Sequence, residues 1–216
     1  ANNDVGCLLV GCLDGTLRML GIRSGNVLTQ YLGHTGYVND CCLSPDDSIL
    51  YSASSDGFLR CWDTKTSECL YSTQPGPSSA SAQEVAVMTV QIVPPNNNHQ
   101  EKLFITTRGN GALFVRAQDG EVLSRYNSSS VGEMQCAALS ARGHFVYCVG
   151  DKDGEIEVHD TTTSQLHSMV RLSLMNSSSS DGAAGARKGT IATFHHPHRN
   201  LLVTLGESGV FRIWCP

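Results

Sequence analysis

The sequence has few charged residues, few aromatic residues and no long apolar run. Charged residues make up 16% of the chain, the net charge is −5, and the nearest approach to a basic patch is Arg187-Lys188. A compact nucleic-acid-binding domain normally carries a basic stripe, so we expect no direct sequence-specific binding of DNA or RNA. No apolar run approaches the roughly 20 residues that span a bilayer, and the first residues do not resemble a signal peptide. The sequence therefore predicts an intracellular protein with no membrane partner.

Motifs for catalysis and metal binding are also missing. There is no P-loop, dinucleotide fingerprint or nucleophile elbow, so we expect no enzyme activity, cofactor or small-molecule substrate. The nine cysteines include no CxxC pair and mostly lie in apolar runs, which is typical of reduced core cysteines. His195, His196 and His198 could bind zinc, but they lie at an expected turn and lack an evident further ligand. The acidic run 151–157 is interpreted as a solvated turn because it lacks the spacing of a calcium loop.

What the sequence does contain is a repeat built around five glycines. Each glycine follows Asp, Asn or Ser, as in tight hairpin turns, and the five are Gly15, Gly57, Gly111, Gly154 and Gly209. Apolar residues stand two and four positions after each glycine, and the position between is mostly charged. This period of two predicts a strand with one buried face. The ten apolar positions are Leu17, Met19, Leu59, Cys61, Leu113, Val115, Ile156, Val158, Phe211 and Ile213.

Further apolar segments before and after each turn predict four-stranded antiparallel units. Such units at this spacing are the signature of a β-propeller, so the fold class is all-β. We expect about five blades of a seven-bladed ring, with the N-terminal blades missing, at approximately 1–32, 33–74, 84–127, 131–172 and 188–216. Segments rich in Pro, Gly, Ser and Asn predict flexible insertions, at 75–83, 94–101 and 173–187.

Residues 33–66, GHTGYVNDCCLSPDDSILYSASSDGFLRCWDTKT, resemble a complete repeat of the WD40 family. The resemblance covers the Gly-His opening, the Ser-x-Asp-Gly turn and the Trp-Asp close. It implies a structural hydrogen-bonded set of four side chains within one blade, namely His34, Ser54, Asp56 and Trp62. The other units each lack part of this set, so they are expected to depend on packing and backbone pairing.

A narrower resemblance concerns residues 33–74 and 131–216, with the segments AALSARGHFVYCVGDKDG and FHHPHRNLLVTLGESGVFRIWCP. These look like the C-terminal blades of the Smu-type spliceosomal WD-repeat proteins, the partners of RED proteins. The resemblance implies a nuclear pre-mRNA splicing factor that acts as a non-enzymatic scaffold for spliceosomal proteins, including a RED-like partner.

Two other kinds of WD40 adaptor are alternatives. Substrate receptors of cullin-type ubiquitin ligases commonly carry a WDxR motif, but this chain has Lys65 where the arginine would stand. A membrane-coat or signalling propeller is excluded only by the narrower resemblance.

In WD40 propellers, partners usually bind one face of the ring, near the start of each first strand and beside each hairpin turn. Alignment to the GHTGYVND unit predicts a partner-binding face, made of Tyr37, Asn39, Ser55, Met88, Glu133, Gln135, Lys152 and Glu207. Tyr37 is the strongest candidate because exposed aromatic side chains supply large contact areas. Packing of Tyr37 on a neighbouring blade is the alternative.

Overall fold

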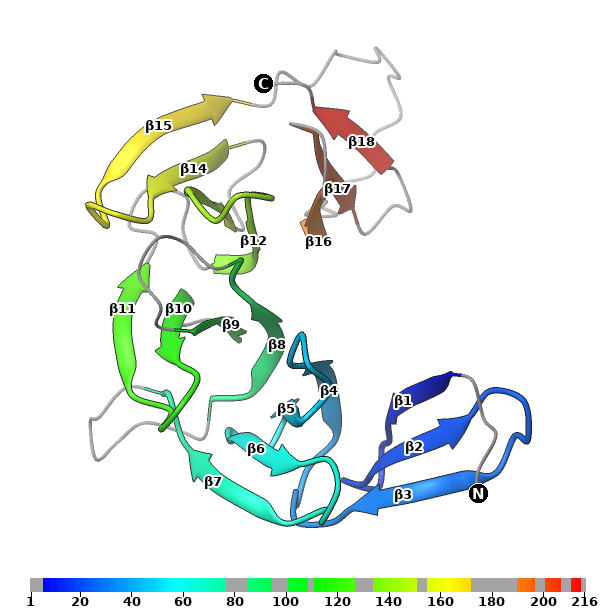
Figure 1. The fold of residues 1–216 in the computed structure, drawn as a ribbon. Helices are drawn as coiled ribbons and strands as arrows, with labels where there is room; N and C mark the ends of the chain where they lie inside the picture. Colours follow the sequence, from blue (N-terminus) through cyan, green and yellow to red (C-terminus); the bar gives the residue numbers. More distant parts are fainter. Residues whose placement is uncertain are drawn as a thin grey trace. The chain divides into compact units, whose positions relative to one another are not determined.

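The computed structural model describes nine segments of the chain, residues 6–76, 85–94, 101–108, 111–126, 134–150, 155–171, 190–196, 201–206 and 211–214. Within these segments every regular element is a β-strand, and the eighteen strands form five antiparallel sheets (Figure 1). The all-β prediction is therefore correct. The predicted insertions at 75–83, 94–101 and 173–187 fall almost entirely outside the described residues.

The sheets follow one another along the chain. The first contains β1 (Cys7–Gly11), β2 (Leu17–Gly21) and β3 (Val27–Tyr31). The second contains β4 (Val38–Leu43), β5 (Ile49–Ser54), β6 (Leu59–Asp63) and β7 (Cys69–Thr73). The third contains β8 (Val87–Ile92), β9 (Lys102–Thr107), β10 (Gly111–Arg116) and β11 (Val122–Tyr126). The fourth contains β12 (Met134–Leu139), β13 (Phe145–Gly150), β14 (Glu155–Asp160) and β15 (Leu166–Arg171). The fifth contains β16 (Thr190–His195), β17 (Leu202–Gly206) and β18 (Phe211–Trp214).

The chain divides into two compact units. The first comprises residues 1–108 and 113–123, and the second comprises residues 109–112 and 124–216. Within each sheet every strand pairs with the next one along the chain, so every sheet is a meander. The predicted hairpin turns are present at Gly15 and Gly57, whose φ angles of 80° and 84° favour glycine.

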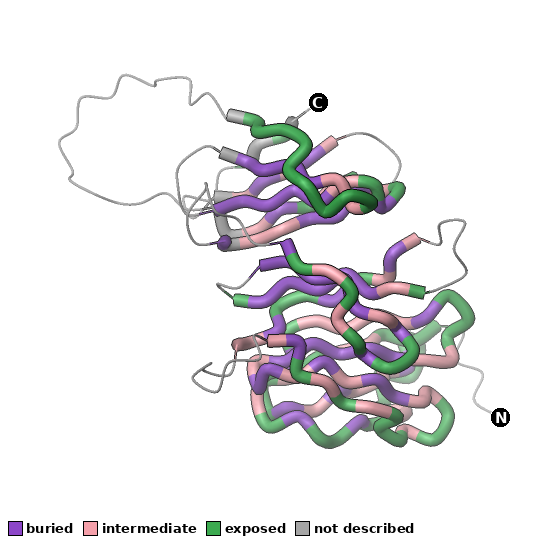
Figure 2. The backbone as a smooth tube through the Cα atoms, turned by 90° about the vertical axis from the view of Figure 1, so that its left-hand side faces the viewer, coloured by how far each residue is buried: buried purple, intermediate pink, exposed green. Residues whose placement is uncertain are grey.

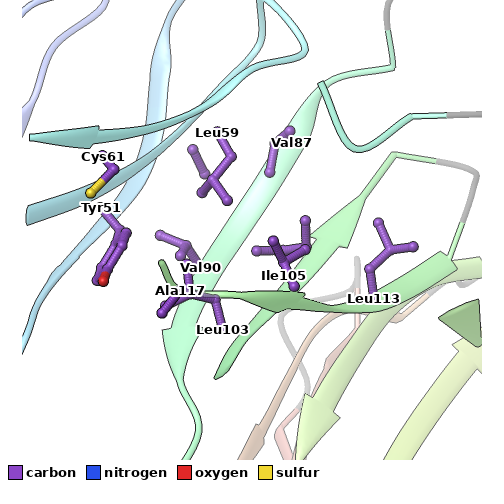
Figure 3. Packing of buried hydrophobic residues seen from close by; sticks show 11 residues of the cluster. Tyr51, Leu59, Cys61, Val87, Val90, Leu103, Ile105, Leu113 and Ala117 are labelled. Carbon is purple, nitrogen blue, oxygen red and sulfur yellow. The ribbon is translucent and has the colours of Figure 1, made fainter. Parts of the chain in front are cut away.

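The largest apolar core lies in the first unit, between the second and third sheets. It contains eleven buried residues from these two sheets and the turn after β10, and nine of them are labelled in Figure 3. A second core lies in the second unit and includes Tyr147, Val149, Ile156 and Val158. Figure 2 shows the burial along the backbone, with buried residues concentrated in inner strands and exposed residues in most turns and in outer strands such as β15.

Tyrosines on outer strands tie neighbouring sheets of the first unit together. The Tyr31 hydroxyl on β3 donates to the Thr64 carbonyl at 3.4 Å, and the Tyr71 hydroxyl on β7 donates to the Ala117 carbonyl at 2.7 Å. Each acceptor directly follows the third strand of the next sheet. The same type of contact therefore joins the first sheet to the second and the second to the third.

The expected one-sided burial of the third strands is wrong at several positions. Phe114 and Glu157 occupy the position expected to face solvent, yet they are only 4% and 2% exposed. Both faces of these strands are covered, so strict alternation does not hold. Conversely, Phe211 and Ile213 were expected to be buried but are 68% and 67% exposed. Nothing in the described part of the chain covers that face of β18.

Candidate protein-binding face

A buried network of hydrogen-bonded side chains holds the loop between β3 and β4 against the second sheet. The Trp62 indole N–H donates to Ser52 Oγ at 2.8 Å, and Ser52 Oγ lies 2.8 Å from His34 Nε2. The other imidazole nitrogen, His34 Nδ1, lies 2.8 Å from Asp56 Oδ2. All four residues are buried, so the network satisfies polar groups that would otherwise be costly to bury.

The serine of this network is Ser52, so the assignment of Ser54 from the family pattern is wrong. Ser54 Oγ instead accepts the backbone N–H of Asp56 at 3.1 Å. The register explains the difference. Trp62 lies opposite Leu50 on β5, which makes Ser52 its diagonal neighbour on the strand and puts Ser54 two residues farther away.

The proton positions in the network follow from its environment. Burial lowers the pKa of His34, and this effect outweighs the opposing influence of the Asp56 carboxylate. Burial alone would raise the pKa of Asp56, but hydrogen bonds from the Phe58 N–H, the His34 ring and the Thr35 N–H lower it overall. We therefore assign a neutral His34 that donates through Nδ1 to an ionised Asp56 and accepts the Ser52 hydroxyl proton at Nε2.

The network places Tyr37 beside the turn between β5 and β6. Asp56 Oδ2 also accepts the Thr35 backbone N–H at 3.0 Å, and the Tyr37 carbonyl accepts the Ser55 N–H at 2.8 Å. A Cβ at Gly36 would lie 2.7 Å from the backbone nitrogen of Asp56, so only glycine permits this approach. The loop that carries Tyr37 is thus held by both side-chain and backbone contacts.

Four of the residues predicted for the partner-binding face come together in the first unit. The Ser55 hydroxyl donates to Asn39 Oδ1 at 3.1 Å, and Asn39 Nδ2 donates to the Val87 carbonyl at 2.8 Å and lies 3.9 Å from Met88 Sδ. Tyr37 is 57% exposed and Met88 is 39% exposed. We call Tyr37, Asn39, Ser55 and Met88 the Tyr37 face. It combines the exposed Tyr37 and Met88 side chains with the hydrogen-bonded pair Ser55 and Asn39.

The other predicted residues of this face are not placed with these four. Glu133, Lys152 and Glu207 lie outside the described residues. Gln135 belongs to β12, but its side chain is not among those that the structure describes.

Sequence reasoning missed Leu13, which is 79% exposed. It lies in the turn between β1 and β2, and this turn packs beside the Tyr37 loop. The Cys12 carbonyl accepts the Val38 N–H at 3.2 Å, and a Cβ at Gly15 would lie 2.5 Å from the His34 carbonyl oxygen. An apolar residue in a hairpin turn, where polar residues usually stand, was the signal that could have identified it.

Asp40 joins the second and third sheets beneath this face. Its Oδ2 accepts the Val90 N–H at 3.0 Å, and its Oδ1 accepts the Cys41 N–H at 2.8 Å. Burial raises the pKa of Asp40, although both hydrogen bonds oppose the rise. Together with the contact from Asn39 to Val87, this carboxylate connects β4 to β8 through side chains.

The described side chains around the face offer little nucleophilic chemistry. Burial, followed by the charge of Asp40, raises the pKa of Cys41 to about 11 and that of Cys42 to about 12. Both thiols therefore stay protonated near neutral pH. In the part of the chain that the structure describes, no three His, Cys, Asp or Glu residues are grouped to hold a metal ion. His195 and His196 fall in that part, whereas His198 does not.

Comparison with protein families defines the class of these sheets. The WD domain, G-beta repeat family matches residues 25–63, a segment that begins just before β3 and ends with β6. Residues 25–63 therefore match a WD40 repeat, and the four-stranded antiparallel sheets are consistent with WD40 propeller blades. The family match and the sheet order differ by one strand, because the repeat contains the outer strand of the first sheet and three strands of the second.

Several known proteins are similar to the chain. The WD40 repeat-containing protein smu1 of Dictyostelium discoideum is 26% identical over 185 residues, which cover 85% of this chain and 31% of that protein. WD repeat domain-containing protein 83 of Homo sapiens is 44% identical over 64 residues, or 29% of this chain and 20% of that protein. Transcription initiation factor TFIID subunit 5 of Drosophila melanogaster is 40% identical over 57 residues, or 26% of this chain and 8% of that protein. The chain thus spans about a third of smu1 and less of the other two.

WD40 repeats generally serve as non-enzymatic scaffolds that bind other proteins. The repeat at residues 25–63 supports this general role here. No helix among the described residues is long and apolar enough to cross a membrane.

Proposed function

We propose that this chain is part of a nuclear scaffold in pre-mRNA splicing, and that the Tyr37 face binds a spliceosomal protein such as a RED-like partner. The similarity to smu1 across 85% of the chain supports this assignment. It agrees with the resemblance of residues 33–74 and 131–216 to Smu-type splicing factors. The scaffold role extends to this chain the general behaviour of WD40 repeats.

The observation that carries the proposed binding site is the exposure of Tyr37 on a fixed loop. More than half of the Tyr37 side chain is accessible, while His34 and Gly36 hold its backbone against the β5–β6 turn. A large aromatic group presented in one conformation loses little entropy when a partner covers it. Leu13 and Met88 extend the apolar contact area around it.

Affinity purification with mass spectrometry tests the proposal. The full-length protein, tagged, is purified from nuclear extract together with two variants. Tyr37→Ala alters the proposed face, and Leu166→Ala removes a leucine on β15 that is 49% exposed. We expect splicing factors with the parent protein and with Leu166→Ala, and at least a tenfold lower yield of one of them with Tyr37→Ala.

The same experiment identifies the alternatives. Recovery of cullin adaptors or coat subunits in place of splicing factors would overturn the splicing assignment. Equal recovery of every partner by Tyr37→Ala, with unchanged thermal stability, would show that this face is not the binding site. Direct binding of a purified RED-like protein to the parent chain, weakened by Tyr37→Ala, would assign the partner.

A further inference from the structure

An open groove of about 680 Å³ lies between the second and third sheets, within the first unit. It occurs at the end of β5 that is away from the β5–β6 turn, because Ile49 and Tyr51 line it. Ser55 of the Tyr37 face is six residues along from Ile49, which corresponds to roughly 20 Å of extended strand. The groove is therefore a separate surface, and the inference drawn from it does not depend on the splicing assignment.

The lining of this groove is mostly apolar. It comprises Ile49, Tyr51, Cys61, Leu70, Tyr71, Glu101, Arg116, Ala117 and Gln118. Leu70 on β7 is 53% exposed, so its side chain is accessible to a bound segment. Figure 3 shows Tyr51 and Cys61 together at one end of the buried cluster. The volume lies within the range of sites that hold a ligand or a few side chains.

The walls of the groove are held in place by close contacts. The Tyr71 hydroxyl donates to the Ala117 carbonyl at 2.7 Å, which joins β7 to the turn after β10. Gly120 in this turn has a φ of +77°, and a Cβ there would lie 2.6 Å from Thr73 Cγ2 and 2.9 Å from Tyr71 Cε2. Because only glycine fits, the turn can rest directly against β7. The groove is thus formed by the packing of two sheets and not by a loose loop.

The Tyr51 side chain contributes a hydroxyl group to the lining of the groove. Tyr51 as a whole is 3% exposed, but its hydroxyl is not among the fully buried side-chain atoms that lack a partner in the described segments. Burial, with smaller contributions from Cys61 and Glu101, raises the pKa of Tyr51, so its hydroxyl remains protonated and able to donate. A bound acceptor in the groove can therefore take a hydrogen bond from this hydroxyl.

The lining of the groove contains two charged residues, Glu101 and Arg116. Arg116 is its basic residue, and its guanidinium is already paired with Asp119 at 2.7 Å and Glu121 at 2.5 Å. Glu101 is exposed and forms no ion pair with any residue that the structure describes. Because Arg116 is neutralised by its own partners, Glu101 is the charge of the lining that remains to attract a cationic group.

We propose that this groove docks a linear segment of a partner protein, which inserts an apolar side chain beside Leu70 and Tyr71 and places a lysine or arginine at Glu101. The apolar walls supply burial for the first group, and the unpaired Glu101 supplies the ion pair for the second. A backbone carbonyl of the segment accepts the Tyr51 hydroxyl. The same chain could then hold two partner segments at once, one here and one at the Tyr37 face.

Differential selection from a phage-displayed library of random 12-residue peptides tests this site. The full-length protein is the target, and a Leu70→Ser/Glu101→Lys variant is used to remove peptides that bind elsewhere. Both substituted side chains are exposed, so the variant should keep the parent melting temperature. We expect enriched peptides that pair an aliphatic or aromatic residue with a nearby lysine or arginine. No enrichment, or enrichment of peptides without this pair, overturns the proposal.

Affinities of one enriched peptide then test each contact. We expect at least a tenfold loss with Glu101→Lys, and recovery of part of that loss when the basic residue of the peptide is replaced by glutamate. Tyr51→Phe, which removes only the hydroxyl, should weaken binding about three- to tenfold. Leu166→Ser, at a similarly exposed leucine on β15, is the matched control for Leu70→Ser and should bind normally. Equal affinities for Glu101→Lys and the parent protein would overturn the proposal.

Discussion

Ser52 Oγ lies 2.8 Å from the indole nitrogen of Trp62, in a sheet where both side chains are almost completely buried. The same oxygen lies 2.8 Å from His34 Nε2. One hydroxyl therefore satisfies a tryptophan on β6 and a histidine on the β3–β4 loop. Through His34 and Asp56 it also positions the loop that presents Tyr37.

Removal of this hydroxyl should destabilise the protein more than removal of the neighbouring one. Ser52→Ala leaves the Trp62 N–H and His34 Nε2 without partners, so we expect a loss of about 2–4 kcal/mol in unfolding free energy. Ser54→Ala removes a single hydrogen bond, to the Asp56 N–H, and should cost about 1 kcal/mol. Urea unfolding followed by tryptophan fluorescence measures both. Equal losses for the two variants would refute the central role of Ser52.

Acidification should destabilise the protein in two steps that involve this network. The pKa of His34 in the folded state lies below its ordinary value of 6.5, so the unfolded chain binds the proton first and stability falls as pH drops below about 6.5. The pKa of Asp56 lies below 3.8, so its contribution is complete above about 3.8 and is lost as pH falls through the folded-state value.

The first step is measured by the melting temperature between pH 8 and pH 5. His34→Gln removes the titrating group, so the variant should start from a lower melting temperature and change less over this range than the parent protein. A His167→Gln variant, at an exposed histidine on β15, serves as the control and should follow the parent curve. Identical slopes for His34→Gln and the parent protein would disprove the neutral state assigned to His34.

The two tyrosine contacts between sheets should differ in strength. The Tyr71 hydroxyl lies 2.7 Å from its carbonyl acceptor, whereas the Tyr31 hydroxyl lies 3.4 Å from the corresponding acceptor. Because hydrogen bonds weaken at long distance, we expect Tyr71→Phe to cost about 1 kcal/mol and Tyr31→Phe about half of that or less. Denaturant unfolding of both single variants makes the comparison. A larger effect for Tyr31→Phe would contradict the geometry.

The Asp40 carboxylate should control the local opening of β8. Asp40→Ala removes the acceptor of the Val90 N–H, so hydrogen exchange at Val90 should accelerate about tenfold or more. Amides of β13, in the other unit, should keep the parent rates and provide the internal control. Hydrogen exchange followed by NMR measures both regions. Unchanged exchange at Val90 would show that the strand pairing between β8 and β9 alone protects it.

Local pattern in the sequence was sufficient for the fold class and the turns. The glycines at positions 15 and 57 adopt the positive φ that an Asp-Gly hairpin requires, because that requirement depends only on neighbouring residues. The alternation after each glycine likewise placed strands at β2, β6, β10, β14 and β18. The positions of Tyr37, Asn39, Ser55 and Met88 came from one aligned repeat, and the first unit brings them together.

Burial and side-chain partners depended on contacts between sheets, which no local pattern contains. Glu157 and Phe114 follow the same alternation as Arg60, yet both are buried because the other face of their strands is covered as well. Leu13 stands in an expected polar turn, and its proximity to the Tyr37 loop depends on how the first sheet packs beside the second.

The sequence by itself determined that this protein is built from antiparallel strand meanders with glycine turns, because turn chemistry and strand periodicity act over a few residues. Only the tertiary structure decided which serine completes the buried network. Ser52 and Ser54 are two residues apart and face the same side of β5, so the sequence pattern alone cannot tell which of them bonds to Trp62. The register that places Trp62 opposite Leu50 selects Ser52, and that register is fixed by the packing of the whole sheet.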